Sequence, residues 1–377
     1  MAKVTLVGLV IFLTVCISIY LITLIHLTSE DRSSYDDYLD NLRGQFSHPR
    51  SHMRRISYER QAPLERKTRL RFMSKLVDGR SLSTTAAYEP IAAEPERLHI
   101  SVSTVPSFTV PVSQVDESVT VVSALLDIGR GKWWYYRRPF EIYLDYLEQM
   151  LRLDVNMVLF VDKKAVDFAL KCRTHLSSKT VLYETSLADV PLWNYRQQMI
   201  KVVELEQKNF RAEWDEAMRH HPEASSADYD LAVNSKSYFL YNASVQNPFH
   251  SSHFVWLDAG YGHGTREVFP KNFRWSPTFP PGKISLIKLT PTTDLLDNYP
   301  LEKLYRQDQS VVSGGFVAGD RTTVGTFHSL FEQQVFALLR DGKVDDDQTI
   351  LVLIIRAYPQ LFNVVHGDWF DAFRLFP

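Results

Sequence analysis

The sequence predicts an α/β protein built on a Rossmann-like, mostly parallel sheet that is flanked by helices. The first observation is an alternation of strand and helix signals over residues 119–184. The second is the character of the strand segments, which are apolar and β-branched, as strands covered on both faces are. The third is an uncharged N-terminal run, which indicates a transmembrane helix and a flexible stalk ahead of the folded part.

The alternation begins with VTVVSAL, a run typical of a buried strand. A helix starts at Pro139, because proline is favoured in the first turn and apolar residues follow at helical spacing. The segments predicted in this half are strand 119–125, helix 139–153, strand 155–162, helix 164–172 and strand 179–184.

The second half carries further signals of the same two kinds. The run QTILVLIIRAY is apolar on all sides, so it predicts a fully buried helix that stops before Pro359. The other predicted elements are helices 195–218, 230–245 and 320–342, and strands 253–258, 283–289, 310–319 and 361–365.

Residues 4–27 contain no Asp, Glu, Lys or Arg. At about 1.5 Å of rise per residue, a helix of this length crosses the roughly 30 Å hydrocarbon core of a bilayer. A cleaved signal peptide has a shorter apolar core and a small-residue cleavage site, and neither is visible. We therefore expect residues 1–3 to be a short cytosolic tail and residues 4–27 to be a transmembrane signal anchor.

The segment after this run is acidic, and the positive-inside tendency then favours a cytosolic N-terminus. This predicts a single-pass type II membrane protein whose domain lies in the lumen of the Golgi or the ER. A basic stretch from Arg43 leaves open an alternative, a cytosol-facing protein that binds anionic lipid. Glycosylation at the sequon Asn242-Ala243-Ser244 would exclude that alternative.

Residues 28–117 are rich in Ser, Arg, Pro and Glu and show no sustained period, so they are expected to form a largely disordered stalk. Residues 118–377 then form one domain. The net charge of −2 argues against bulk binding of nucleic acid. With only two cysteines, one of them inside the membrane run, a disulfide-stapled scaffold is excluded.

Ligands of open α/β sheets bind beyond the carboxyl ends of the strands, so the segments that follow the strands are the candidates for chemistry. After the first strand comes LLDIGRGKWWYYRRP, where cations suit phosphates and aromatic rings suit a base or a sugar. A solvated turn is the alternative here. The donor-binding candidates in this segment are Asp127, Arg130, Lys132 and Arg138.

Three further segments follow later strands. Asp258 ends the strand in FVWLDAGYGHG, where a carboxylate suits a divalent cation beside a diphosphate. Gly314 and Gly315 in SGGFVAGD suit a pocket floor lined by backbone, or alternatively a bulge. His366, after the last strand, is a candidate nitrogen ligand for a metal.

The acidic run DDDQT begins the buried helix. Acidic residues at a helix start complement the macrodipole, which is the ordinary explanation of such a run. Three in succession exceed what capping needs. Asp346, Asp347 and Gln348 are therefore the candidate catalytic residues.

Taken together and in order, LLDIGRGKW, YRRPFE, NMVLFVD, NSKSYFLYNAS, WLDAGYGHG, SGGFVAGD and DDDQT resemble the HtrL/YibB-like family over residues 118–365. This family is distantly similar to glycosyltransferases of the GT-A fold. The resemblance implies a nucleotide-sugar donor, Mn²⁺ or another divalent cation, and a glycan or glycoconjugate acceptor.

In GT-A enzymes a D-x-D motif binds the metal and a late histidine completes its shell. Asp258 matches the first Asp of that motif and His366 the late His, whereas Gly260 replaces the second Asp. The DDDQT segment is similar to the Asp/Gln helix start beside the sugar in glycogenin-like enzymes. Together with the predicted anchor and stalk, the resemblance implies a membrane-anchored glycosyltransferase, and the missing Asp leaves open a catalytically inactive sugar-binding or scaffold protein.

Overall fold

The computed structural model describes residues 54–56 and 116–377. The predicted anchor at residues 4–27 lies outside these residues, as does nearly all of the predicted stalk. Within the described part, no helix combines the length and the hydropathy of a bilayer span.

The described strands form one eight-stranded sheet in the order β1-β4-β3-β2-β5-β7-β6-β8. Its first half is the predicted parallel block, because β4, β3, β2 and β5 pair in parallel. The strands are β1 (Arg54–Ile56), β2 (Asp116–Leu125), β3 (Asn156–Val161), β4 (Thr180–Glu184), β5 (Ser251–Leu257), β6 (Ile284–Lys288), β7 (Val312–Asp320) and β8 (Phe362–His366).

Strand β7 departs from the predicted parallel sheet. It pairs antiparallel with both β5 and β6, so the sheet is mixed, although β6 and β8 again run parallel to β5. Short β1 is also antiparallel to its neighbour β4. Strand direction left no trace in the sequence because β7 is covered on both faces and is therefore as apolar as a parallel strand.

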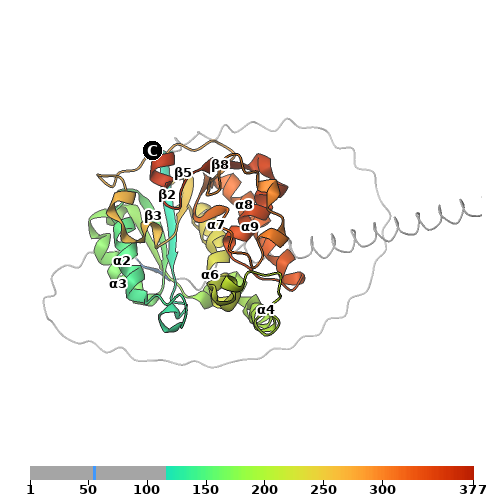
Figure 1. The fold of residues 1–377 in the computed structure, drawn as a ribbon. Helices are drawn as coiled ribbons and strands as arrows, with labels where there is room; N and C mark the ends of the chain where they lie inside the picture. Colours follow the sequence, from blue (N-terminus) through green and yellow to red (C-terminus); the bar gives the residue numbers. More distant parts are fainter. Residues whose placement is uncertain (1–53, 57–115) are drawn as a thin grey trace, which may run out of the picture.

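Helices cover both faces of the sheet (Figure 1). Helices α2, α3 and α10 pack on one face, whereas α4, α6, α7, α8 and α9 pack on the other. The helices are α2 (Phe140–Leu151), α3 (Lys163–Cys172), α4 (Arg196–Lys208), α5 (Pro222–Ser225), α6 (Ala227–Asn234), α7 (Lys236–Gln246), α8 (Arg321–Arg340), α9 (Asp347–Ala357) and α10 (Ala372–Leu375).

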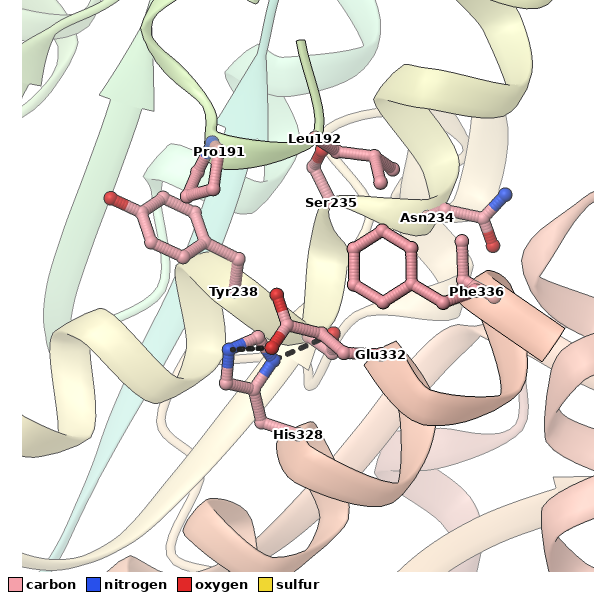
Figure 2. A pocket seen from close by; sticks show the side chains of 10 residues that line it. Pro191, Leu192, Asn234, Ser235, Tyr238, His328, Glu332 and Phe336 are labelled. Carbon is pink, nitrogen blue, oxygen red and sulfur yellow. Dashed lines mark hydrogen bonds and ion pairs between the residues drawn. The ribbon is translucent and has the colours of Figure 1, made fainter. Parts of the chain in front are cut away.

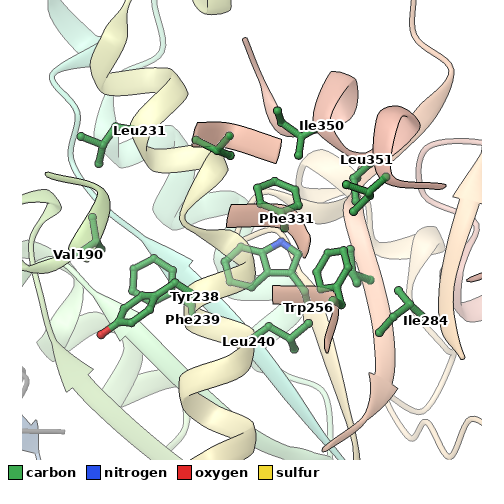
Figure 3. Close-up of a cluster of buried hydrophobic side chains, with 14 of the residues drawn as sticks. Val190, Leu231, Tyr238, Phe239, Leu240, Trp256, Ile284, Phe331, Ile350 and Leu351 are labelled. Atoms are coloured by element: carbon green, nitrogen blue, oxygen red, sulfur yellow. The ribbon is translucent and has the colours of Figure 1, made fainter. Parts of the chain in front are cut away.

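Side-chain alternation along β5 divides the core in two. Phe254 and Trp256 belong to the cluster under α7, α8 and α9, whereas Val255 and Leu257 belong to the cluster under α2 and α3. In Figure 3 the indole of Trp256 lies amid Phe239, Phe331 and Leu351. The second half of the strand, from Phe254 to Leu257, is thus enclosed on both faces.

Two predicted helices differ from the observed ones. The helix predicted over 195–218 ends earlier, at Lys208, where the Asn209 side chain donates to the Leu205 carbonyl (3.0 Å) and closes the last turn. The helix predicted over 230–245 is two helices, α6 and α7. They break at Ser235, whose hydroxyl donates to the Leu231 carbonyl (2.7 Å). The break makes Lys236 the first residue of α7.

The segment that follows β8 runs back over the sheet edge and joins the core. The backbone N–H of Ala372 donates to the Tyr261 hydroxyl (2.9 Å), and the Trp275 indole donates to the Phe376 carbonyl (2.6 Å). The Phe376 ring stacks on Phe316 of β7 with centroids 5.0 Å apart. These contacts anchor the segment beside the ends of β5 and β7.

Candidate functional site

A pocket of about 590 Å³ opens at the carboxyl ends of β2 and β5. Because β7 is reversed, its first residues, not its last, lie at this edge, and Gly315 accepts a hydrogen bond from the Asp258 backbone N–H (3.1 Å). The lining includes charged, imidazole and amide side chains from five segments: Arg130, Arg138, His221, Lys236, Asp258, His263, Asp347 and Gln348. The position agrees with the general rule for ligands of α/β sheets.

The ammonium group of Lys236 lies on the floor of this pocket. It lies 3.1 Å from the Asp258 carboxylate and 2.8 Å from the Asp347 carboxylate, and it donates to the Gly314 carbonyl (3.1 Å). Burial alone would lower the pKa of Lys236, but the two carboxylates outweigh burial and raise it above its usual value. The lysine is therefore positively charged at physiological pH.

Asp258 is held by a second contact. Its Oδ1 accepts a hydrogen bond from the indole N–H of Trp256 (2.7 Å). Its side chain is the more open of the two carboxylates around Lys236, with 38% of its surface exposed against 6% for Asp347. Asp258 is thus the carboxylate that faces the pocket opening.

The three consecutive acids of DDDQT do three different things. Asp346 caps α9, because its Oδ1 accepts from the backbone N–H groups of Gln348 (3.1 Å) and Thr349 (3.2 Å). Asp345 pairs with buried Arg306 (3.2 Å). Of the three acids, only Asp347 lines the pocket, beside Gln348. Burial raises the pKa of Asp347 to about 6, although Lys236 acts to lower it.

The loop after β2 supplies a cationic and aromatic wall. Arg130 donates to the Tyr143 hydroxyl (2.9 Å), and the Arg138 guanidinium lies 5.3 Å from the centroid of the same ring. Both arginines line the pocket, whereas Lys132 is exposed and does not. Asp127 does not line it either: it accepts from the Gly129 N–H (2.9 Å) and pairs with Lys164, which shapes the turn.

His366 does not line the pocket. It ends β8, three strand positions from β5, which corresponds to roughly 14 Å between the two strands. Its Nδ1 lies 3.2 Å from the Lys288 carbonyl oxygen. The strands before Asp258 and His366 end at the same edge of the sheet, as predicted, but β7 and β6 separate them.

The residues present do not fit the divalent cation that the resemblance implies. Around Asp258, the ammonium of Lys236 already occupies the space between the two carboxylates, and Gly260 supplies no second carboxylate to the motif. Across residues 54–56 and 116–377, no three His, Cys, Asp or Glu side chains are grouped so that they could hold a metal ion. The Mn²⁺ expectation therefore stays a prediction without a matching donor set.

Three lining residues with basic side chains, Lys236, His221 and His263, were not among the predicted site residues. Lys236 had a usable signal, since it is the only charged residue in the otherwise uncharged run 231–249. His221 had none: only the fold places it on the pocket, with Nδ1 2.8 Å from both Glu223 carboxylate oxygens. The hydrogen bond to Glu223 raises the pKa of His221.

A second, much smaller cavity lies between α7 and α8 (Figure 2). It measures about 10 Å³, room for about one water molecule. His328 faces it from α8, with Nδ1 3.1 Å from the Ser237 hydroxyl and Nε2 3.6 Å from the Glu332 carboxylate. Burial lowers the pKa of His328 to about 3 and raises that of Glu332 to about 7, so the histidine is neutral.

The fold and the larger pocket define a class: an α/β protein with a ligand pocket at the carboxyl edge of a mixed sheet. The family described as "Bacterial protein of unknown function (HtrL_YibB)" matches residues 117–377. The chain belongs to this family, and the resemblance noted in the sequence is confirmed. Protein HtrL of Escherichia coli (strain K12) is 23% identical over 269 residues, covering 69% of this chain and 92% of the bacterial protein.

Solved structures give more distant likenesses. The apo form of mouse xyloside xylosyltransferase 1 shares 16% identity and covers 67% of this chain and 85% of its own, with a TM-score of 0.32. The 4-diphosphocytidyl-2C-methyl-D-erythritolsynthase from Anaerococcus prevotii DSM 20548 shares 8% identity and covers 67% and 88%, with a TM-score of 0.31. Likenesses at this level carry no information on what this chain binds.

Proposed function

We propose that this protein is a membrane-anchored glycosyltransferase that transfers a sugar from a nucleotide-sugar donor to a glycan or glycoconjugate. The observation that carries the proposal is the composition of the larger pocket, which places two arginines on one wall and two carboxylates with a lysine on its floor. Cations suit a diphosphate, and carboxylates suit sugar hydroxyls. The volume of about 590 Å³ falls in the range of small-molecule sites.

We assign the residues of the pocket the following roles. Arg130 and Arg138 bind the donor diphosphate, and the Tyr143 ring beside them packs against the base or ribose. Gln348 faces the donor sugar: its Oε1 is buried without a hydrogen-bond partner among the described residues, which leaves it free for a hydroxyl. Asp347 lies beside it and stabilises positive charge that develops at the anomeric carbon.

The cellular setting belongs to the same proposal. A signal anchor at residues 4–27 and a stalk would hold the domain in the lumen of the Golgi or the ER, where nucleotide-sugar donors and glycoconjugate acceptors meet. A cytosol-facing orientation remains the competing arrangement. The sequon at Asn242 does not separate the two, because the Asn242 side chain is buried within α7.

The competing function is a catalytically inactive sugar- or nucleotide-binding protein on the same fold, which the Gly260 substitution favours. Turnover distinguishes the two. The full-length chain in detergent micelles, given a panel of nucleotide sugars, should release nucleoside diphosphate from one of them, measured by chromatography. Binding without release would identify the inactive protein.

The binding step has its own test. Titration calorimetry with nucleoside diphosphates should detect a ligand, and the double change Arg130→Ala/Arg138→Ala should weaken it at least about tenfold, because charge-assisted hydrogen bonds are lost. Lys132→Ala is the matched control, since this cation lies in the same loop but outside the pocket. Equal affinities of the double variant and the control would contradict the proposed donor site.

A further inference from the structure

Lys236 stands in a place that helix energetics disfavours. It is the first residue of α7, where the helix macrodipole is positive and a cation is unfavourable. Its side chain is only 15% exposed, so it also loses most of its hydration. A lysine at this position therefore does not serve the stability of α7.

The surroundings of Lys236 converge on its ammonium from separate elements. Asp258 follows β5, Asp347 begins α9, and the Gly314 carbonyl comes from the start of β7. The three oxygens lie 2.8–3.1 Å from one point. Two carboxylates and one carbonyl are the oxygen set that a divalent cation takes, here arranged around nitrogen.

Gly314 of β7 makes this arrangement sterically possible. A Cβ atom at Gly314 would lie 2.2 Å from Oδ2 of Asp347, so any side chain there would displace the carboxylate from the lysine. The Asp258 and Asp347 carboxylates and the Gly314 carbonyl thus surround a space that holds one cationic group, and the Lys236 ammonium occupies it.

We propose that Lys236 is the built-in cation of this site: its ammonium takes the place of a divalent metal between Asp258 and Asp347 and supplies positive charge to the leaving diphosphate. The role toward the diphosphate rests on the proposed function, whereas the replacement of a metal by Lys236 rests on geometry alone. With Arg130 and Arg138, the floor and wall carry three positive charges against two carboxylates. This balance suits an anionic ligand without a metal.

The first test is metal binding by the full-length chain without nucleotide, followed by the spin-resonance signal of free Mn²⁺. The wild-type protein should bind little Mn²⁺ at this site. Lys236→Ala leaves two carboxylates and a carbonyl around an empty space, so its affinity for Mn²⁺ should rise at least about tenfold. Adding Asp258→Asn to Lys236→Ala should remove the gain.

Lys288→Ala is the matched control. Lys288 is also a buried lysine, but its ammonium donates to the Thr290 carbonyl (2.9 Å) and its side chain lines no part of the pocket. It should gain no Mn²⁺ site. Tight Mn²⁺ binding by the wild-type protein, or no gain in Lys236→Ala when circular dichroism shows it folded, would overturn the proposal. Lys236→Met, which keeps the side-chain volume, replaces the alanine variant if that one fails to fold.

The second test uses uridine diphosphate as the probe. Wild-type affinity should be equal within about twofold in EDTA and in Mn²⁺. Lys236→Ala should lose at least about tenfold in EDTA and recover part of that in Mn²⁺. Wild-type binding that requires Mn²⁺ would overturn the built-in cation. Failure of any nucleotide to bind would refute the proposed function instead, and the metal titration would still decide the role of Lys236.

Discussion

The guanidinium of Arg306, which is fully enclosed, lies 3.2 Å from the carboxylate of Asp345 and 2.8 Å from that of Glu206. It also donates to the Val344 carbonyl (2.8 Å), so it fixes the chain immediately before α9. Arg306 thereby sets where Asp347 enters the pocket, although it touches no part of the pocket itself.

Removing this guanidinium should destabilise the fold. Arg306→Met leaves two carboxylates enclosed without their cation, so the free energy of unfolding should fall by about 3–5 kcal/mol. Urea denaturation measures the loss. Arg340→Met is the control, because Arg340 is 74% exposed with a 3.9 Å ion pair and should change stability by less than about 0.5 kcal/mol. Similar losses in both variants would contradict the assigned role.

Two adjacent glycines of β7 offer a matched pair of substitutions. Gly314→Ala puts Cβ 2.2 Å from the Asp347 carboxylate and should weaken nucleotide binding at least about tenfold by moving that group. Gly315→Ala meets nothing closer than 3.5 Å and should bind within about twofold of wild type. Calorimetry on both variants provides the comparison. Equal affinities would show that the position of Asp347 does not matter for binding.

Glu332 of the small cavity, whose side chain is 22% exposed, should make stability depend on pH (Figure 2). Burial raises its pKa from 4.5 in the unfolded chain to about 7 in the folded one. The folded state therefore prefers the protonated carboxyl, and this preference, full below pH 4.5, is lost as the pH rises through 7. At pH 8 the enclosed carboxylate destabilises the fold by roughly 3 kcal/mol.

Glu332→Gln keeps the shape without the charge. The variant should be more stable than wild type by up to about 3 kcal/mol at pH 8, and by less than about 1 kcal/mol at pH 5. Urea denaturation at the two pH values measures the difference. Glu302→Gln, on an exposed glutamate, should show no such divergence. A variant as unstable as wild type at pH 8 would mean that Glu332 stays protonated there or finds a partner.

The N-terminal predictions need a separate test, since they fall outside the described residues. Deleting residues 1–27 should move the protein from the membrane pellet to the supernatant after carbonate extraction, because the uncharged run is removed. Limited proteolysis of the released protein should stop near residue 115. A resistant fragment that retains residues 50–80 would contradict the stalk.

The sequence predicted the elements better than their directions. Runs of apolar residues bounded by turn residues located β2, β3, β4 and β5, because each strand is enclosed and lies between polar turns. Direction is decided by connections between distant segments, which leave no local pattern, and so the prediction of a mostly parallel sheet did not identify β7 as the antiparallel strand. Gly314 and Gly315 line the pocket as expected, yet they lie in the first half of their strand and not after its end.

For the site, too, the sequence predicted part of the arrangement and missed part of it. Asp258, Asp347, Gln348, Arg130 and Arg138 line the pocket as expected, since charged residues beside strand ends are informative. Asp346 matched the signal equally well but serves as a helix cap. Whether an acid caps or faces a pocket depends on rotation about one turn of helix, and no pattern of residue types encodes that.

The route of the chain after β8 has a consequence for C-terminal truncation. Trp369 and Phe370 line the larger pocket, and Phe376 packs on β7, yet all three follow the last described strand of the sheet. A chain shortened after His366 would keep every described strand but lack one wall of the pocket. Ligand affinity should therefore depend on a short segment that contributes no strand to the sheet.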